Sequence, residues 1–181
     1  MSDPTAWATL ERRRVTAWNG EQGTCGTVAV VGLGKIGLPL AGQYADAGWN
    51  VVGVDVQPAV VDGLNAGRVH VDEEPGLAER ITTARREGRF EATLSHAEAV
   101  GHADVVVMIV PLGLSDEHEP DYRMIDPATE AVGRGLRPGT LVIYETTLPV
   151  GDTRRRFGPL LERSSGLAAG DPEAEIGRAH V

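Results

Sequence analysis

The chain has 181 residues, of which 41% are hydrophobic but only 4% aromatic, so aliphatic side chains must form the core of a single domain. The formal net charge of −9 argues against a surface that binds nucleic acid or an anionic membrane. No signal peptide and no apolar run of membrane-spanning length is apparent, and a lone cysteine excludes an internal disulfide. These features predict a cytoplasmic protein.

The chain opens with a polar segment, residues 1–26, which we expect to be an extension outside the core with one short helix near residues 5–15. From residue 27 onward, apolar β-branched runs alternate with amphipathic segments. This alternation predicts a Rossmann-type α/β domain with a doubly wound parallel sheet in the order 3-2-1-4-5. The expected strands are 27–31, 50–55, 90–94, 104–110 and 140–145, and the expected helices are 36–47, 59–65, 74–87, 95–101, 126–136 and 151–163.

The most informative stretch is a G-x-G-x-x-G pattern, Gly32-Leu-Gly-Lys-Ile-Gly37, directly after the first predicted strand. A strand that leads through a glycine turn into a helix is typical of a dinucleotide-binding βαβ unit. Gly32 permits the tight turn, Gly34 lets the backbone approach a pyrophosphate, and Gly37 lets the helix pack closely on the strand. The helix N-terminus then offers unpaired N–H groups to the phosphates.

An acid, Asp55, ends the second predicted strand, where a carboxylate would bind the ribose hydroxyls of the adenosine half. A 2′-phosphate would be repelled there, and no Arg or Lys follows in residues 56–58 to bind one. The sequence therefore favours NAD over NADP, although a turn or helix-capping role for Asp55 is the alternative. At the carboxyl ends of strands one and four the crevice should bring together Gly32, Leu33, Gly34, Lys35, Ile36, Gly37, Asp55, Val110, Pro111, Glu145 and Thr146.

Several motifs follow one another along the chain: Gly32-Leu-Gly-Lys-Ile-Gly-Leu-Pro39, Gly53-Val-Asp55, Asn65-Ala-Gly67, Glu74-Pro-Gly-Leu77, Ala103-Asp104, Val110-Pro111 and Glu145-Thr-Thr-Leu-Pro-Val-Gly151. Through these motifs residues 27–165 resemble the UDP-glucose/GDP-mannose dehydrogenases, which oxidise C6 of a nucleotide sugar to a carboxylate with two NAD. The V-P-L and E-T-T-L-P variants are most similar to the branch that oxidises UDP-N-acetylhexosamines such as UDP-N-acetylmannosamine.

The resemblance implies a cysteine that captures the aldehyde, a lysine and an acid that handle water and protons, and a threonine that assists them. Of these groups only the threonine is represented, as Thr147, for which a capping role at the strand end is the alternative. Cys25 precedes the first strand and is not expected to be the nucleophile. The five histidines show no metal-binding spacing, so no metal site is expected. The implied partner is a nucleotide sugar, bound by a homo-oligomeric parent.

The C-terminal part suggests that the sheet is incomplete. We assign residues 27–166 to the NAD-binding domain and 167–181 to an irregular tail, with the sixth strand and later domains missing. The last six residues, 176–181, match the translation of a common sequencing adapter that continues into a stop codon, so we interpret them as adapter-derived. The chain would then be an inactive fragment of a nucleotide-sugar 6-dehydrogenase.

Two other functions remain open at this point. A β-hydroxyacid dehydrogenase domain also begins with G-L-G-x-x-G, but it usually carries Met where this chain has Ile36. A non-catalytic NAD-sensing Rossmann module can stand alone at about this length, but the Glu145-Thr-Thr segment, expected beside the nicotinamide end, favours an enzyme.

Overall fold

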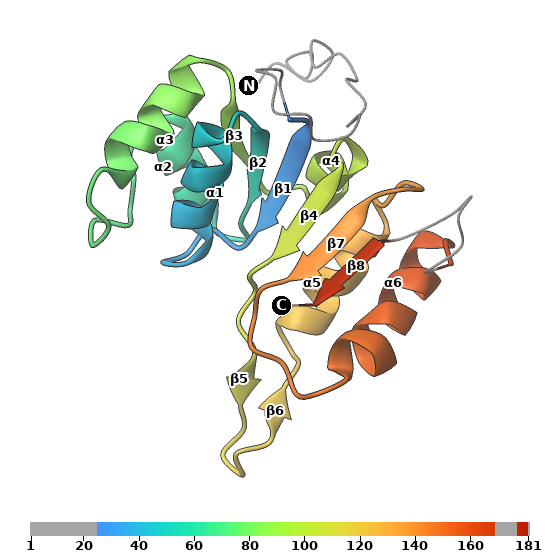
Figure 1. Ribbon diagram of the computed structural model, residues 1–181. Helices are drawn as coiled ribbons and strands as arrows, with labels where there is room; N and C mark the ends of the chain where they lie inside the picture. Colours follow the sequence, from blue (N-terminus) through green and yellow to red (C-terminus); the bar gives the residue numbers. More distant parts are fainter. Residues whose placement is uncertain (1–24, 169–176, 181) are drawn as a thin grey trace.

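The computed structural model describes residues 25–168 and 177–180, so the expected helix near residues 5–15 lies outside the described part. A six-stranded sheet forms the centre, in the order β3-β2-β1-β4-β7-β8, and every strand pair in it is parallel (Figure 1). The first five positions confirm the predicted order. The strands are β1 (Thr27–Val31), β2 (Asn50–Val54), β3 (Phe90–Thr93), β4 (Val105–Met108), β7 (Leu141–Tyr144) and β8 (Gly177–His180).

Helices cover both faces of the sheet, because successive residues of a strand point to opposite sides. In β1, Val28 and Val30 pack into one apolar cluster while Ala29 and Val31 pack into the other. The first cluster is closed by α1 (Gly37–Asp46), α2 (Pro58–Asn65) and α3 (Leu77–Arg86). The second is closed by α4 (His96–Gly101), α5 (Ile125–Gly133) and α6 (Gly158–Ser165).

The register places the carboxyl ends of the three central strands at one level. Val31 of β1 lies beside Val54 of β2 and beside Met108 of β4. Backbone bonds continue this alignment past the strands, since Gly32 N–H donates to Val54 O at 2.8 Å and Ile109 N–H donates to Val31 O at 2.8 Å. Strands β2 and β3 are added on one side of β1, whereas β4 is added on the other side. Such a topological switch point leaves a crevice for a ligand at the carboxyl ends of β1 and β4.

Two local features differ from the sequence-based expectation. The segment between β4 and α5, for which no helix or strand was expected, contains an antiparallel hairpin of β5 (Gly113–Leu114) and β6 (Pro120–Asp121) that projects beyond the sheet (Figure 1). The last predicted helix begins as a π-helix, η2 (Thr153–Phe157), before α6. Strands of two residues are too short to show an alternating pattern, and a π-turn has no distinctive composition.

The expectation of a missing sixth strand, within an irregular tail, is wrong in this structure. Gly177–His180 forms β8 and pairs with Leu141–Tyr144 of β7 in parallel. The prediction failed because strand pairing uses backbone N–H and C=O groups, which any extended segment carries whatever its side chains. Within the described residues, no helix is long and apolar enough to cross a lipid bilayer.

Candidate functional site

The glycine turn between β1 and α1 is shaped by three different constraints. Gly32 has a φ of +99°, which side chains rarely allow, and a Cβ on Gly37 would lie only 1.8 Å from the carbonyl oxygen of Gly32. Gly34 is different, because a Cβ there would meet no protein atom within 4 Å. Backbone conformation therefore explains the first glycine and close packing the third, but neither explains the second. An exposed glycine facing open space fits a ligand that must approach the backbone closely.

Asp55 follows β2 and lies beside this turn. Its carboxylate oxygen Oδ2 accepts a hydrogen bond from Leu33 N–H at 3.0 Å, and Oδ1 accepts one from Gln57 N–H at 2.9 Å. The two backbone donors fix the carboxylate in place while the side chain stays partly exposed. Asp55 thus keeps further lone pairs for hydroxyl donors from a ligand.

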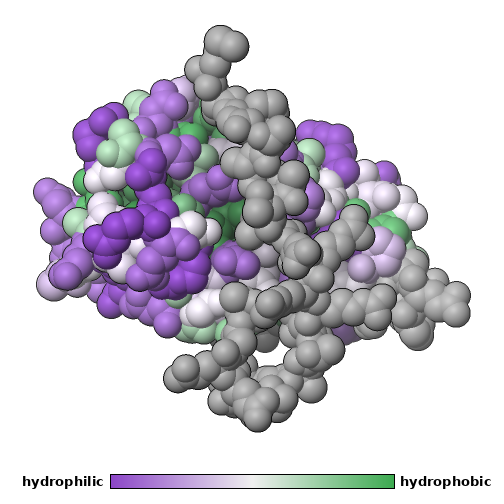
Figure 2. All heavy atoms as spheres, turned by 90° about the horizontal axis from the view of Figure 1, so that it is seen from above, coloured by the Kyte–Doolittle hydropathy of each residue, from purple (hydrophilic) through white to green (hydrophobic). Residues whose placement is uncertain are grey.

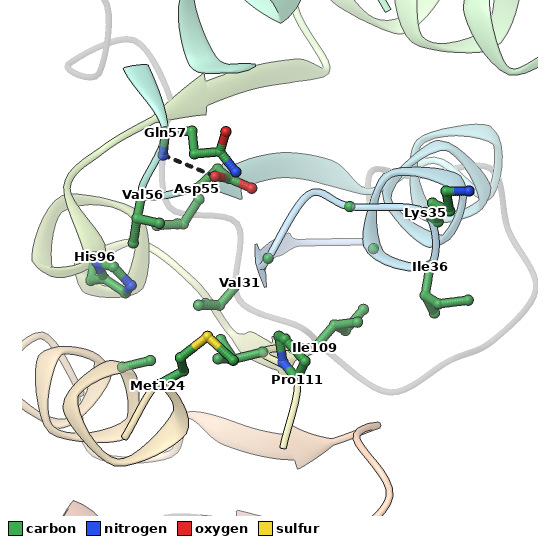
Figure 3. Close-up of a pocket in the computed structure, with 16 residues that line it drawn as sticks. Val31, Lys35, Ile36, Asp55, Val56, Gln57, His96, Ile109, Pro111 and Met124 are labelled. Atoms are coloured by element: carbon green, nitrogen blue, oxygen red, sulfur yellow. Dashed lines mark hydrogen bonds between the residues drawn. The ribbon is translucent and has the colours of Figure 1, made fainter. Parts of the chain in front are cut away.

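A cavity of about 510 Å³ opens at this edge of the sheet. In Figure 3, Asp55, Val56, Gln57 and His96 lie at one end and Lys35 and Ile36 at the other. The wall between them is apolar and is formed by Val31, Ile109, Pro111 and Met124. A pocket with an acid at one end and a helix N-terminus at the other suits a dinucleotide.

Eight of the predicted binding residues line this cavity: Gly32, Gly34, Lys35, Ile36, Gly37, Asp55, Val110 and Pro111. Leu33 does not line it, because its side chain is fully buried in the core against Gly53. Its contribution is made through the backbone, by the N–H bond to Asp55.

Glu145, Thr146 and Thr147 follow β7 and do not line the cavity. The hydroxyl of Thr146 donates to the carbonyl oxygen of Val110 at 2.7 Å, which ties this segment to the cavity wall. Glu145 and Thr147 are exposed. The structure therefore places the segment next to the cavity without bringing these two side chains into it.

Several lining residues were not predicted from the sequence. Val56 and Gln57 follow Asp55 directly, so their positions could have been inferred from it. His96, Met124 and Ala128 come from α4 and from the start of α5, far away in the chain. No local pattern marks them, since only the packing of α4 and α5 brings them to the cavity.

Electrostatics at the acidic end favour a neutral imidazole. Burial, assisted by the positive charge of Arg134, holds the pKa of His96 below its ordinary value. His96 therefore adds a polar but uncharged group near Asp55. Within the residues that the structure describes, no group of three or more His, Cys, Asp or Glu side chains is placed to hold a metal ion.

Comparison with known proteins supports the assignment that this geometry suggests. The profile of the UDP-glucose/GDP-mannose dehydrogenase family, NAD binding domain, matches residues 26–177. The UDP-N-acetyl-D-mannosamine dehydrogenase of Escherichia coli K12 is 38% identical over 141 residues, which are 78% of this chain and 32% of that protein.

Two solved structures share the fold. The GDP-mannose dehydrogenase of Pseudomonas aeruginosa superimposes with a TM-score of 0.77 at 28% identity, over 83% of this chain and 34% of that one. The UDP-D-ManNAc dehydrogenase of Pyrococcus horikoshii superimposes with a TM-score of 0.74 at 32% identity, over 86% of this chain and 36% of that one.

The chain thus spans about a third of the length of the relatives that it matches. The glycine pattern alone left two enzyme families open. The family match selects the UDP-glucose/GDP-mannose dehydrogenases over the β-hydroxyacid dehydrogenases. It also identifies NAD as the cofactor of this domain. This chain belongs to the UDP-glucose/GDP-mannose dehydrogenase family, of which it carries the NAD-binding domain.

Proposed function

We propose that this chain supplies the NAD-binding part of a nucleotide-sugar 6-dehydrogenase, and that the sugar is a UDP-N-acetylhexosamine such as UDP-N-acetylmannosamine. The observation that carries the proposal is that Asp55 and Gly34 line the same cavity in a chain of this family, with open space where a Cβ of Gly34 would lie. The V-P-L and E-T-T-L-P variants, and relatives named as UDP-N-acetyl-D-mannosamine dehydrogenases, support the choice of sugar.

Each part of the cavity has a role in holding the cofactor. The amides of the glycine turn and the start of α1 bind the pyrophosphate, to which Gly34 allows close approach. Asp55 accepts hydrogen bonds from the ribose hydroxyls of the adenosine half. Val56, Met124 and neutral His96 then border the adenine, while Val110 and Pro111 lie towards the nicotinamide. Bound NAD supplies the hydride acceptor.

We assign a catalytic role to Thr147, as the family resemblance implies. Its exposed side chain lies one residue beyond Thr146, which is anchored to Val110 of the cavity wall. From that position its hydroxyl would help to orient water or a proton donor at the reacting carbon. Glu145, which is also exposed, keeps its proposed role as a cofactor-binding residue of this segment.

The remaining elements of the proposal concern the parent protein. We propose that it works in the cytoplasm as a homo-oligomer, and that its nucleophilic cysteine and lysine lie outside residues 1–181. Cys25 does not serve as the nucleophile, because it precedes β1 and lies near Gly48, at the opposite end of β1 from the glycine turn. The chain alone should bind NAD without oxidising a nucleotide sugar.

Calorimetric titration of the chain with NAD and with NADP tests the binding part of the proposal. We expect saturable binding of NAD, weaker binding of NADP, and stabilisation of the fold by about 2.7 kcal/mol when NAD is present at a hundred times its Kd. A chain that folds but binds neither cofactor would contradict it.

A second experiment tests the enzymatic part against the non-catalytic alternative. The source gene should be read past the codon for Asp171, and its product assayed for NADH formation with UDP-N-acetylmannosamine. A longer frame with a cysteine and a lysine in the family pattern, and NADH formation that is lost in Thr147→Val, is the expected result. A product that binds NAD but reduces none of it would favour the sensing module.

A further inference from the structure

A backbone carbonyl in the glycine turn is held from outside the cavity. The imidazole Nε2 of His70 lies 2.9 Å from the carbonyl oxygen of Leu33, the residue between Gly32 and Gly34. Because a carbonyl can only accept, Nε2 must carry the proton and donate it. Leu33 has no exposed surface, so its carbonyl oxygen has no access to water, whereas the His70 side chain that donates to it is exposed.

The Leu33 residue is therefore fixed at three points. Its N–H is bound by the carboxylate of Asp55, its side chain is buried against Gly53, and its C=O is bound by His70. The first two contacts fix the residue's position. Only the third fixes the rotation of the peptide unit that joins Leu33 to Gly34.

That rotation decides where the next N–H group points. The described peptide bonds are trans, and in a trans peptide the C=O and the following N–H point in opposite directions. His70 is not among the residues that line the cavity, whereas Gly34 is. A carbonyl drawn towards His70 thus directs the N–H of Gly34 away from His70, to the side where the pyrophosphate would lie.

The segment that carries His70 is itself attached to the domain. Val69 and Val71, on either side of His70, pack against the core formed with α1, α2 and α3, and Val71 is only 6% exposed. Glu73 in the same segment pairs with Lys35 of the glycine turn at 2.6 Å. Both side chains of this ion pair are well exposed, so it contributes little. His70 provides the directed contact.

We propose that His70 is a positioning residue for NAD: by holding the Leu33 carbonyl it presents the Gly34 N–H to the cofactor's pyrophosphate. His70 itself touches neither the adenosine nor the nicotinamide. The inference rests on the proposed NAD site and adds to it a residue from the segment between α2 and α3.

The test compares ligands with and without a pyrophosphate on the 181-residue chain. In His70→Ala we expect ADP-ribose and NAD to bind about five- to tenfold more weakly, the effect of one lost hydrogen bond. Adenosine, which lacks the pyrophosphate, should keep its affinity within about twofold. His70→Gln places an N–H donor at a similar reach and should restore binding of ADP-ribose.

A matched control is His102→Ala, which removes a histidine between α4 and the start of β4, at the end of the central strands away from the cavity, and should leave all three affinities unchanged. Unchanged ADP-ribose binding in His70→Ala would overturn the inference. Equal weakening of adenosine would do so too, since it would indicate general damage to the cavity, as would failure of His70→Gln to restore affinity. If the wild-type chain binds neither NAD nor ADP-ribose, the proposed function fails as well.

Discussion

At the scale of single residues, Gly34, which lies before α1, and Gly37, which begins it, should respond differently to an added methyl group. In Gly34→Ala the new Cβ meets no protein atom within 4 Å, so the free energy of unfolding should change by less than about 0.5 kcal/mol. NAD should nevertheless bind at least about tenfold more weakly, because the methyl group occupies the approach of the pyrophosphate. Urea denaturation and calorimetric titration measure the two effects.

Gly37→Ala is the matched comparison. Its Cβ would lie 1.8 Å from the carbonyl oxygen of Gly32, so α1 must move away from β1 and the fold should lose about 3 kcal/mol or more. A Gly34→Ala chain as unstable as Gly37→Ala, or one with unchanged NAD affinity, would show that Gly34 is kept for packing.

We expect Asp55 to determine whether NAD or NADP is accepted. Asp55→Ala removes the acceptor for the ribose hydroxyls and the repulsion of a 2′-phosphate, so NAD should bind more weakly and the preference for NAD over NADP should narrow. Two backbone donors, Leu33 N–H and Gln57 N–H, also lose their partner, which should cost about 1–3 kcal/mol of stability.

The ratio of the NADP and NAD dissociation constants is the decisive measurement, with Asp62→Ala on the exposed side of α2 as the control. A ratio that does not change in Asp55→Ala would mean that another residue selects the cofactor.

At the scale of elements, the packing of η2 on β7 should make stability sensitive to alkaline pH. The ring of Tyr144 stacks on Phe157 with 4.8 Å between centroids, and its hydroxyl contacts Thr129 Oγ1 at 3.2 Å. Burial raises the pKa of Tyr144 far above its ordinary value near 10. The unfolded chain then loses this proton above pH ~10 while the folded chain keeps it.

The sign follows from proton linkage: where the folded state binds one more proton, the free energy of unfolding falls by about 1.4 kcal/mol per pH unit. The stabilisation that comes from neutral Tyr144 is complete below pH ~10 and is lost as the pH rises towards the raised pKa of this residue. Tyr144→Phe lacks this group, so above pH ~10 its stability should decline less steeply than that of the wild type. Parallel curves from urea denaturation across this range would contradict the prediction.

A second contact between elements joins the segment after β7 to the start of α5. The guanidinium of Arg156 forms a forked pair with Asp126, with contacts of 2.5 and 3.0 Å, and lies 3.6 Å from the ring centroid of Tyr122. Tyr122 in turn donates its hydroxyl hydrogen to Asp152 at 2.5 Å. These contacts attach the two ends of η2 to Asp126 of α5 and to Tyr122, which precedes α5.

Arg156→Lys keeps the charge but loses the fork and the planar group over the ring. We expect the free energy of unfolding, measured by thermal or urea denaturation, to fall by about 1 kcal/mol while the affinity for NAD stays unchanged. Arg154→Lys, on an exposed position of the same turn, is the control and should have no effect. Equal stability of the two variants would mean that the forked pair contributes nothing.

At the scale of the whole molecule, the sequence was sufficient for the parts of the fold that rest on local pattern. The fully apolar run before Val110 and the β-branched run before Gly32 predicted buried parallel strands, and the glycine turn located the switch point. His96, Met124 and His70 were not predicted as site or support residues. Each reaches its position only because a helix or a connecting segment packs there, which depends on contacts between distant parts of the chain.

The sixth strand was also not predicted, because its place in the sheet depends on pairing with a distant part of the chain. Its position leads to a last prediction. β8 pairs with β7 through four residue pairs, so a chain that stops after Leu167 would leave the outer backbone groups of β7 without partners. An exposed edge of this kind pairs readily with another copy. We expect the shortened chain to self-associate with increasing concentration in light scattering, and Ile143→Lys on β7 to suppress this. Because the cavity lies over β1, β2 and β4, NAD affinity should persist. A shortened chain that stays monomeric would show that the β7 edge is already protected by its short length and flanking turns.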